Sequence, residues 1–599
     1  MATSEPYKYL PLQYPDSIRL LHIRPSQDAD APVQCLVTTQ RLSDTWLNYE
    51  ALSYTWGDAS KPAAILIGDN DTSSLTITQN CFAALRSLRQ RVQQRTVWID
   101  AICINQDDVD ERTAQVRMMD KIFSSAPRTI VYLGEETDGS RTVFSELAEA
   151  QGAPRMYSPV TGADVIDRPI PCTAVVDALE ELLQCPWFRR IWVVQEVHCS
   201  SSKSLTVMCG RAEAPWTVLH ECLLGYRDHR VTRQELPVVF DIYRYSSDQD
   251  IWYGLFNHAI HTRAYLSTDP RDRLFALKAL LDGPQEEMDC LIDYSKSVEE
   301  VFAEFAGILF SRIGVQMLCL SRHPHNRAMA SWMPDWSQNT PIKQASDYVH
   351  DGQVDYDSAT GMLGSAKIIS SPSSETLGVY NSLSVCGTAV GEVNDIGPPV
   401  VFTDHGDATR QWSHIIELLH LPESGIRDHL SAHPESPFTE HFLRVARGTS
   451  IQQISEFLDR GSNKVRFGPL ALALTGPRVE TNSRSPQQLM LMNHEASVGT
   501  ERINVLRDAW QHCRAVAIGD TFLGIAPDGV QLGDVAYLVE GAISPCLLRP
   551  GPSGRWALVS GDCYVTDMTP KPVWPGRPGR LIRREGLPEH ASVEDIIIC

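Results

Sequence analysis

Polar side chains at the end of one apolar segment are the first candidates for chemistry in this chain. Residues 96–100, TVWID, predict a short strand covered on both faces, with Asp100 at its carboxyl end. Open α/β sheets place their ligand crevices at that edge, so Asp100 is a candidate substrate-binding residue. The amides of Asn105 and Gln106 follow in a tight polar loop and are candidates as well. In the alternative interpretation, the carboxylate caps the loop and the amides satisfy backbone groups.

A second group of candidates lies at the end of an earlier apolar segment, residues 51–56 (ALSYTW). Trp56 and Asp58 flank a glycine, which signals a turn. Their indole and carboxylate are candidates for substrate binding, and the alternative is a turn closed by an aromatic side chain. Trp98 and Ile99 are predicted to be core residues, because they lie inside a strand that is apolar throughout.

The elements that must position these side chains alternate between strands and helices. Leu85 and Leu88 follow Phe82 at helical spacing, with Thr78 or Asn80 as the N-cap. Residues 108–126 predict one helix and residues 128–134 the strand after it, so part of the sheet is expected to be parallel. The other strands expected in this part of the chain are 17–23, a hairpin formed by 64–68 and 75–78, and 205–210.

The rest of the chain predicts further regions, because 599 residues are too many for one hydrophobic core. We expect an α/β module with a mostly parallel sheet flanked by helices, then a helical region, and a β-rich subdomain at the C-terminal end. The expected boundaries are a lead-in strand at 1–48, the α/β module at 49–200, a helical region at 201–340, a variable and loop-rich region at 341–500, and the β-rich subdomain at 501–599.

The composition restricts the partners and the compartment. A formal net charge of −21 disfavours nucleic acids and anionic lipid surfaces as partners. No segment reads as a signal peptide or a membrane span, and none of the 15 cysteines forms a CxxC pair. We therefore expect no metal site and a reducing, cytoplasmic location. Phosphate-binding loops, dinucleotide-binding glycine motifs, HExxH and GxSxG are absent from the sequence.

Three segments, in order, resemble the motifs of one known family. Residues 49–58 (YEALSYTWGD), 97–106 (VWIDAICINQ) and 188–197 (FRRIWVVQEV) are similar to the opening, central and closing motifs of the fungal heterokaryon incompatibility (HET) domain. Residues 268–273 (TDPRDR) and 332–337 (WMPDWS) resemble full-length HET proteins, and the resemblance is weakest over 340–500.

The resemblance implies a role in non-self recognition and programmed cell death, through allelic or non-allelic protein partners and homo-oligomers. HET domains are also distantly similar to Toll/interleukin-1 receptor (TIR) domains, some of which hydrolyse NAD. This similarity implies a TIR-like fold and leaves open an NAD glycohydrolase activity, with NAD as a substrate and no cofactor.

The TIR resemblance singles out a tryptophan and a glutamate four residues apart, here Trp192 and Glu196. It implies that Glu196 is catalytic, because a carboxylate can stabilise the oxocarbenium ion formed on the ribose. Trp192 and Arg190 are then substrate-binding residues, and Trp56, Trp98 and Trp192 offer aromatic faces for a planar base. In the alternative interpretation, Glu196 forms a structural ion pair with Arg189 or Arg190. Two functional alternatives also remain: a non-enzymatic recognition module, and recruitment to another pathway such as secondary metabolism.

Overall fold

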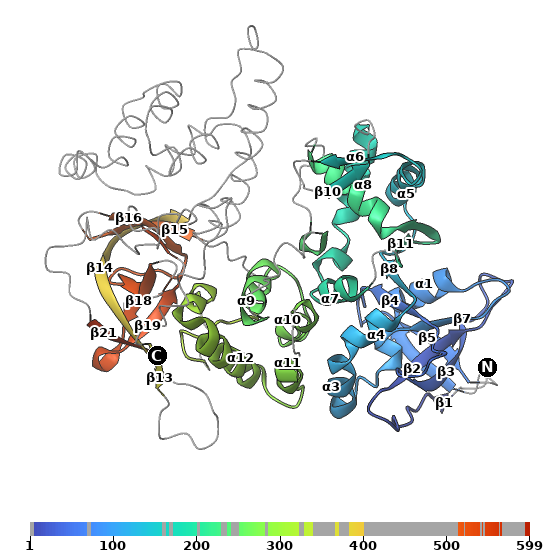
Figure 1. The fold of residues 1–599 in the computed structure, drawn as a ribbon, viewed down its shortest axis with the longest axis horizontal. Coiled ribbons are helices and arrows are strands. Elements are labelled where there is room, and N and C mark those ends of the chain that lie inside the picture. Colours follow the sequence, from blue (N-terminus) through green and yellow to red (C-terminus); the bar gives the residue numbers. More distant parts are fainter. Residues whose placement is uncertain are drawn as a thin grey trace, which may run out of the picture. The chain divides into compact units, whose positions relative to one another are not determined.

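In the computed structural model the chain divides into two compact units, Met1–Ser297 and Val298–Cys599 (Figure 1). The structure describes residues 5–68, 73–158, 163–166, 172–200, 204–228, 237–240, 251–281, 286–322, 329–338, 366–369, 382–399, 513–519, 522–539, 542, 545–561, 563–565 and 594–599.

A ten-stranded mixed sheet organises unit 1, in the order β1-β6-β5-β3-β2-β7-β4-β8-β11-β12. Five of its nine neighbouring pairs are parallel, and the run β7-β4-β8-β11 is parallel throughout. The strands are β1 Glu5–Pro6, β2 Ser17–Ile23, β3 Gln34–Arg41, β4 Glu50–Tyr54, β5 Pro62–Ile67, β6 Ser73–Thr78, β7 Arg95–Trp98, β8 Arg128–Tyr132, β11 Leu205–Cys209 and β12 Ala212–Pro215.

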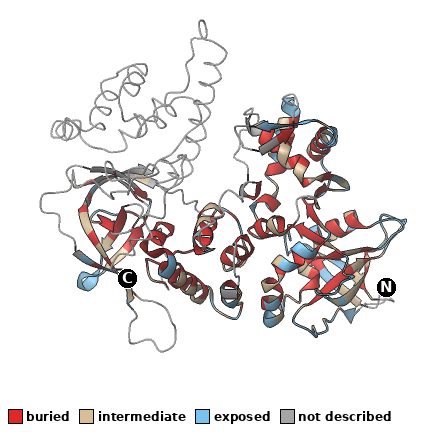
Figure 2. Cartoon of the chain, in the orientation of Figure 1, coloured by how far each residue is buried: buried red, intermediate tan, exposed pale blue. Residues whose placement is uncertain are grey.

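The parallel centre of the sheet is apolar because both of its faces are covered. Strands β4, β7, β8 and β11 are largely buried along their lengths (Figure 2). β4 is in register with β8 from Glu50 opposite Arg128 to Tyr54 opposite Tyr132. Trp98 is fully buried and packs edge-on against Phe123, with 5.7 Å between the ring centroids. The predicted core positions of this strand are therefore confirmed.

Helices connect these strands and pack along the sheet. α1 packs on β5 and β6, and α8 packs on β11 and β12. The helices of unit 1 are α1 Gln79–Leu88, α2 Asp100–Cys103, α3 Val109–Arg117, α4 Met119–Ser125, α5 Asp138–Ala150, α6 Thr173–Leu183, α7 Trp192–Cys199, α8 Trp216–Asp228, α9 Ile251–His261, α10 Asp272–Phe275 and α11 Glu286–Leu291, with 3-10 turns η1 Pro186–Arg189, η2 Val238–Phe240 and η4 Lys278–Leu280 and the separate hairpin β9 Arg155–Ser158 and β10 Ala163–Ile166.

Local signals placed several of these elements correctly. The 17–23 strand and the hairpin of β5 and β6 are confirmed. Thr78 is the N-cap of α1, because its hydroxyl accepts a hydrogen bond of 3.3 Å from the backbone N–H of Cys81. Parallel pairing around β4 is confirmed as well, but the sheet is mixed, since four of its pairs are antiparallel.

The single helix expected over 108–126 is divided in two at Met118. The ammonium group of Lys278 donates a hydrogen bond of 2.6 Å to the carbonyl of Arg117. Helices commonly break where a side chain takes a carbonyl from the helical ladder. Met118 accordingly donates to the carbonyl of Gln115, as in a 3-10 turn. The break depends on a residue far away in sequence, which is why periodicity did not predict it.

The α/β unit extends beyond the expected boundaries at residues 48 and 200. β2 and β3 lie inside the sheet, between β5 and β7. β11 pairs with β8 in parallel, and β12 forms the far edge. The lead-in and the strands after residue 200 are therefore parts of one sheet with the module.

Unit 2 contains a helix and a small barrel-like sheet. Five strands form a closed ring, β17-β18-β19-β21-β14, because β14 also pairs with β17. β15, β16 and β20 extend the sheet from β14. The elements are α12 Val298–Ile313, η5 Gly314–Leu320, β13 Lys367–Ile369, β14 Ser382–Pro399, β15 Cys513–Ile518, β16 Phe522–Pro527, β17 Val535–Val539, β18 Cys546–Pro550, η9 Pro552–Gly554, β19 Trp556–Ser560, β20 Tyr564–Val565 and β21 Glu594–Ile598.

The β-rich part thus begins earlier than residue 501. The 18-residue β14 falls within the region expected to be loop-rich, and it pairs with β13, β15, β17 and β21. Its register shifts at three places, and such bulges bend a strand so that it can serve two parts of a sheet. The rest of the 341–500 region lies outside the described residues, apart from β13 and its immediate neighbour.

One helical segment of the described residues, Val298–Leu320, has the length and apolar composition of a membrane-spanning helix. In the structure, 78% of its most apolar window is buried. The core helix of a globular domain has the same properties, so the segment is weak evidence for a membrane span.

The break at Met118 leads to a stability prediction. Lys278 is buried, with its ammonium 3.4 Å from the carboxylate of Asp120. Lys278→Met removes the charge partner of a largely buried carboxylate, so we expect a loss of about 3 kcal/mol in the free energy of unfolding. Lys61→Met is the control, because the Lys61 side chain is 74% exposed and its ion pair with Asp58, at 3.9 Å, is weak and open to solvent. Its cost should be about 0.5 kcal/mol or less. If denaturant titrations gave the same loss of unfolding free energy for both variants, this would contradict the role of Lys278 as a buried charge partner.

Candidate functional site

Two carboxylates and one guanidinium come together in unit 1 at the carboxyl ends of β4 and β7. Arg190 lies 3.8 Å from the carboxylate of Glu196 and donates a hydrogen bond to the carbonyl of Tyr54. The positive charge of the same guanidinium lowers the pKa of Asp100, and the negative charge of Asp100 raises the pKa of Glu196. The structure thus brings three of the predicted site residues into one electrostatic cluster.

A hydrogen-bonded chain holds the carboxylate of Glu196 in place. Glu196 lies on α7 and is only 2% exposed. The hydroxyl of Ser53 on β4 donates to one carboxylate oxygen, and the indole N–H of Trp187 donates to that hydroxyl at 2.7 Å. The other oxygen faces Arg190. Glu196 is therefore paired, as the structural interpretation expected, but it is also held inside the site.

Burial changes the protonation of both carboxyls. It raises the pKa of Glu196 to about 7, against the opposing effects of Arg190 and of the Ser53 hydroxyl. Burial also raises the pKa of Asp100, which the same arginine opposes. A carboxyl with a pKa near 7 populates both its acid and its base form at neutral pH. This part of the site is chemically able to give or take a proton, or to stabilise a positive charge.

Asp100 is the first residue of α2 and is linked to the Trp56 turn. The indole N–H of Trp56 donates to the Asp100 carboxylate at 2.9 Å, and the N–H of Ala101 donates to it at 2.7 Å. The Trp56 side chain is 39% exposed. Gly57 adopts φ +78°, and a Cβ there would lie 2.8 Å from Asn80. The turn therefore needs a glycine, and it holds the indole over Asp100.

Three other predicted site residues make local contacts. Asp58 is exposed, and hydrogen bonds from the hydroxyl of Ser60 and from its backbone N–H, at 2.9 Å, lower the pKa of Asp58 as in a turn. The side-chain amide of Gln106 donates to the carbonyl of Asp100 at 3.0 Å. The backbone N–H of Asn105 donates to Glu111 at 2.7 Å. For Gln106 and Asp58 these contacts match the structural alternative, although ligand binding by either residue stays a prediction.

Trp192 lies in a different cluster from Glu196. Its indole hydrogen-bonds to Asp272, which also accepts a hydrogen bond of 2.5 Å from the hydroxyl of Tyr294. The guanidinium of Arg112 lies 4.0 Å from the centre of the Tyr294 ring. Burial raises the pKa of Asp272 to about 6. Although Trp192 and Glu196 are four residues apart on α7, their side chains therefore contact different partners.

Two other residues of the central motif belong to the core. Trp98 is fully buried, so it cannot form an aromatic wall for a ligand together with Trp56. Cys103 is buried as well, and burial raises the pKa of its thiol to about 12. This thiol is therefore unreactive, because the thiolate is the reactive form.

Sequence reasoning missed Ser53 and Trp187 as partners of Glu196, and Asp272 as a partner of Trp192. One signal for Ser53 was available: it is the polar residue of an otherwise apolar strand end, and buried polar groups need partners. No group of three or more metal-binding side chains occurs among the described residues.

Comparisons with known proteins agree with the resemblance of the motifs. Residues 49–196 match the family described as heterokaryon incompatibility protein (HET). The chain is 31% identical to "Heterokaryon incompatibility protein 6, OR allele" of Neurospora crassa over 402 residues, which cover 53% of this chain and 58% of the relative. The chain thus spans less than two thirds of the length of this relative. No solved structure matches the chain.

The raised pKa of Glu196 predicts how stability depends on pH. Between its ordinary pKa of 4.5 and about 7, the folded state holds a proton that the unfolded state releases, so stability falls as pH rises. Glu196→Gln keeps the shape and removes the titration. Relative to this variant, the parent should lose about 3 kcal/mol of unfolding free energy between about pH 4.5 and about pH 8. Parallel pH profiles in urea unfolding would contradict the placement of Glu196.

Proposed function

The chain carries a domain of the heterokaryon incompatibility (HET) family at residues 49–196, and on that premise we propose that it acts in fungal non-self recognition. The observation that carries the proposal is the 31% identity to a protein named for heterokaryon incompatibility. That alignment, over 402 residues, is much longer than the HET domain, so the likeness includes parts outside it.

The site geometry supports a function located within the HET domain. Ser53 and Tyr54, Asp100, and Arg190 with Glu196 come from three separate segments, and all of them contact or act on the Arg190–Glu196 pair. Separate segments that converge on buried charges are costly to assemble. In active sites such perturbed carboxyls are frequent, although ion-pair networks produce them too.

Within this role, the first candidate activity is the cleavage of NAD. The bond between nicotinamide and ribose breaks heterolytically, and the neutral base leaves with the electron pair. A carboxylate at Glu196 would stabilise the resulting oxocarbenium ion. Water then attacks the ribose carbon, and a carboxylate accepts the proton that the water loses. A pKa near 7 lets Glu196 accept this proton at neutral pH.

The second candidate is a recognition module without catalysis, and the burial of Glu196 favours it. With 2% exposure, the carboxylate reaches a substrate only after Ser53 or Arg190 moves. In this candidate the cluster holds the HET domain in one shape, and protein partners or further copies of the chain bind elsewhere. A cytoplasmic location is part of both candidates and rests on the cysteine pattern.

Nicotinamide release separates the two candidates. If the domain hydrolyses NAD, the purified full chain should release nicotinamide, and Glu196→Gln should reduce the rate at least about a hundredfold, since a positioned carboxyl contributes that much. Glu149→Gln is the control, because Glu149 is an exposed glutamate of α5. Melting of each variant checks its fold. Equal rates for all three proteins would exclude Glu196 as the catalytic residue.

Expression in a fungal host tests the wider proposal. We expect overproduction of the full chain in a filamentous fungus to arrest growth, and Glu149→Gln to arrest it equally. Arrest that persists in Glu196→Gln would favour the recognition module, whereas its loss in a folded variant would favour catalysis. A host that grows normally at a verified high level of the parent protein would contradict the incompatibility role.

A further inference from the structure

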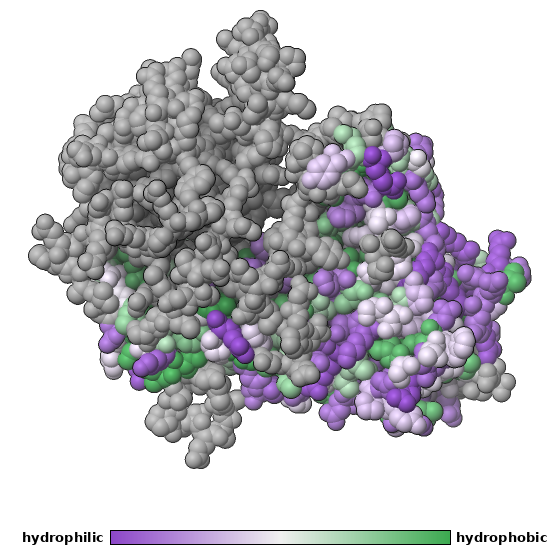
Figure 3. Space-filling model, viewed as in Figure 1, coloured by the Kyte–Doolittle hydropathy of each residue, from purple (hydrophilic) through white to green (hydrophobic). Residues whose placement is uncertain are grey.

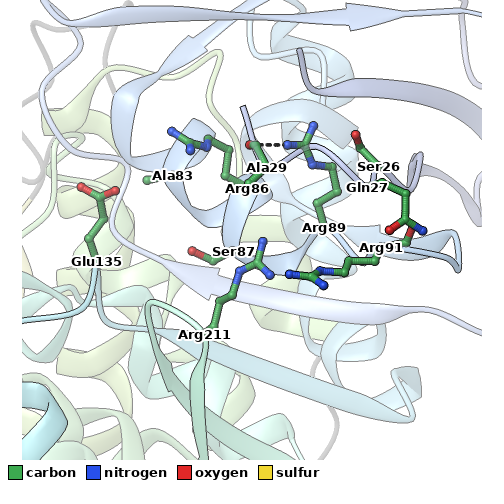
Figure 4. Close-up of a pocket in the computed structure, with 10 residues that line it drawn as sticks. All are labelled: Ser26, Gln27, Ala29, Ala83, Arg86, Ser87, Arg89, Arg91, Glu135 and Arg211. Carbon is green, nitrogen blue, oxygen red and sulfur yellow. Dashed lines mark hydrogen bonds between the residues drawn. The ribbon is translucent and has the colours of Figure 1, made fainter. Parts of the chain in front are cut away.

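A cavity of about 250 Å³ in unit 1 is lined by four arginines, although the chain as a whole is strongly acidic. Figure 4 shows the guanidinium groups of Arg91 and Arg211 pointing toward each other across it. On the face that Figure 3 shows, hydrophilic residues outnumber hydrophobic ones over the described part of unit 1. The cavity is lined by Ser26, Gln27, Ala29, Ala83, Arg86, Ser87, Arg89, Arg91, Glu135 and Arg211.

One wall of the cavity is held in place by hydrogen bonds from a single arginine. Arg89 is buried and donates hydrogen bonds to the carbonyls of Ala29 at 2.7 Å and Ala31 at 2.8 Å. It also donates to the carbonyls of Asp28 and Pro32. These bonds fasten the 28–32 loop to the end of α1. Arg89 is therefore a structural residue of the site, because its guanidinium donors are occupied by backbone carbonyls.

The opposite side is held just as firmly. Gly210 adopts φ +57° in the turn between β11 and β12, and a Cβ there would lie 2.7 Å from the side chain of Glu136. The turn and the loop after β8 are thus in close contact, which fixes the backbone that carries Arg211. Only a glycine fits this approach.

The charges inside the cavity are poorly balanced. Arg86 has an exposed ion pair with Asp30 at 3.3 Å. Among the described residues, the guanidinium groups of Arg91 and Arg211 have no carboxylate partner within 4 Å. Glu135 is the one acidic side chain in the lining, and it lies on the far side of the cavity from Arg91 in Figure 4. Like charges that face each other repel, so this arrangement is stabilised by an anion placed between them.

We propose that this cavity is a binding site for the phosphate groups of a small molecule, held by Arg91 and Arg211. Planar guanidinium groups bind phosphate oxygens through paired, charge-assisted hydrogen bonds. The hydroxyl of Ser87 also lines the cavity, and it is hydrogen-bonded to the hydroxyl of Tyr132 at 3.3 Å. Typical ligand pockets hold about 300–1,000 Å³, so the cavity suits the phosphate end of a small molecule rather than a large ligand. This proposal does not depend on the activity proposed for Glu196.

Inorganic pyrophosphate is the probe for this site. Calorimetric titration of the full chain at physiological salt should detect saturable binding. Arg91→Ala and Arg211→Ala should each weaken that binding about tenfold or more, the change expected when one charge-assisted contact is lost. Arg41→Ala is the matched control, because Arg41 is an exposed arginine of β3 paired with Asp16 at 2.9 Å. It should leave the affinity unchanged.

Failure of the proposal is equally measurable. An affinity that is the same in the parent, both cavity variants and the control would overturn it, as would the absence of pyrophosphate binding by the parent at millimolar concentration. The melting temperatures of the unliganded variants confirm that each is folded. ADP and AMP form the second arm: tighter binding of ADP than of pyrophosphate identifies a nucleotide as the source of the phosphates, and weaker binding identifies free diphosphate.

Discussion

The guanidinium of Arg190 stabilises the ionised forms of two buried carboxyls, Asp100 and Glu196, inside unit 1. It lies 3.8 Å from Glu196 and opposes the rise that burial causes in the pKa of Asp100. Buried carboxylates without a positive partner take up protons or move into solvent. Because Arg190 also donates to the carbonyl of Tyr54, its charge connects the end of β4 with α2 and α7. The arrangement of the candidate site depends on this one side chain.

Residues outside the family match keep Arg190 in position. The N–H of Ile191 donates to the carbonyl of Leu266 at 3.0 Å, and the N–H of Leu266 donates back to the carbonyl of Arg189 at 2.5 Å. A second cluster, built on Asp272, holds Trp192 at the start of α7. The helical part of unit 1 therefore supports residues 49–196, the segment that matches the family, which gives a physical reason why the compact unit extends to Ser297.

The net charge of the chain conceals its local electrostatics. A total of −21 describes the charge of the whole surface only on average. At the arginine-lined cavity, the end of α1 and the β11–β12 turn bring positive charges together. Arg211 is more than a hundred positions away from Arg86, Arg89 and Arg91 in the chain, so no short sequence window contains all four arginines.

Short-range patterns in the sequence determined the main strands, the cap of α1 and the apolar core around Trp98, because these depend on neighbouring residues and on burial alone. The motifs predicted in the same way the match of residues 49–196 to the heterokaryon incompatibility family. The tertiary structure alone decided the break at Met118, the 18-residue strand β14 and the partners of Trp192. Each of these depends on a contact between distant segments. Glu196 illustrates the division: its residue type was evident from the sequence, whereas its burial, its pKa and its neighbours Ser53 and Arg190 were set by folding.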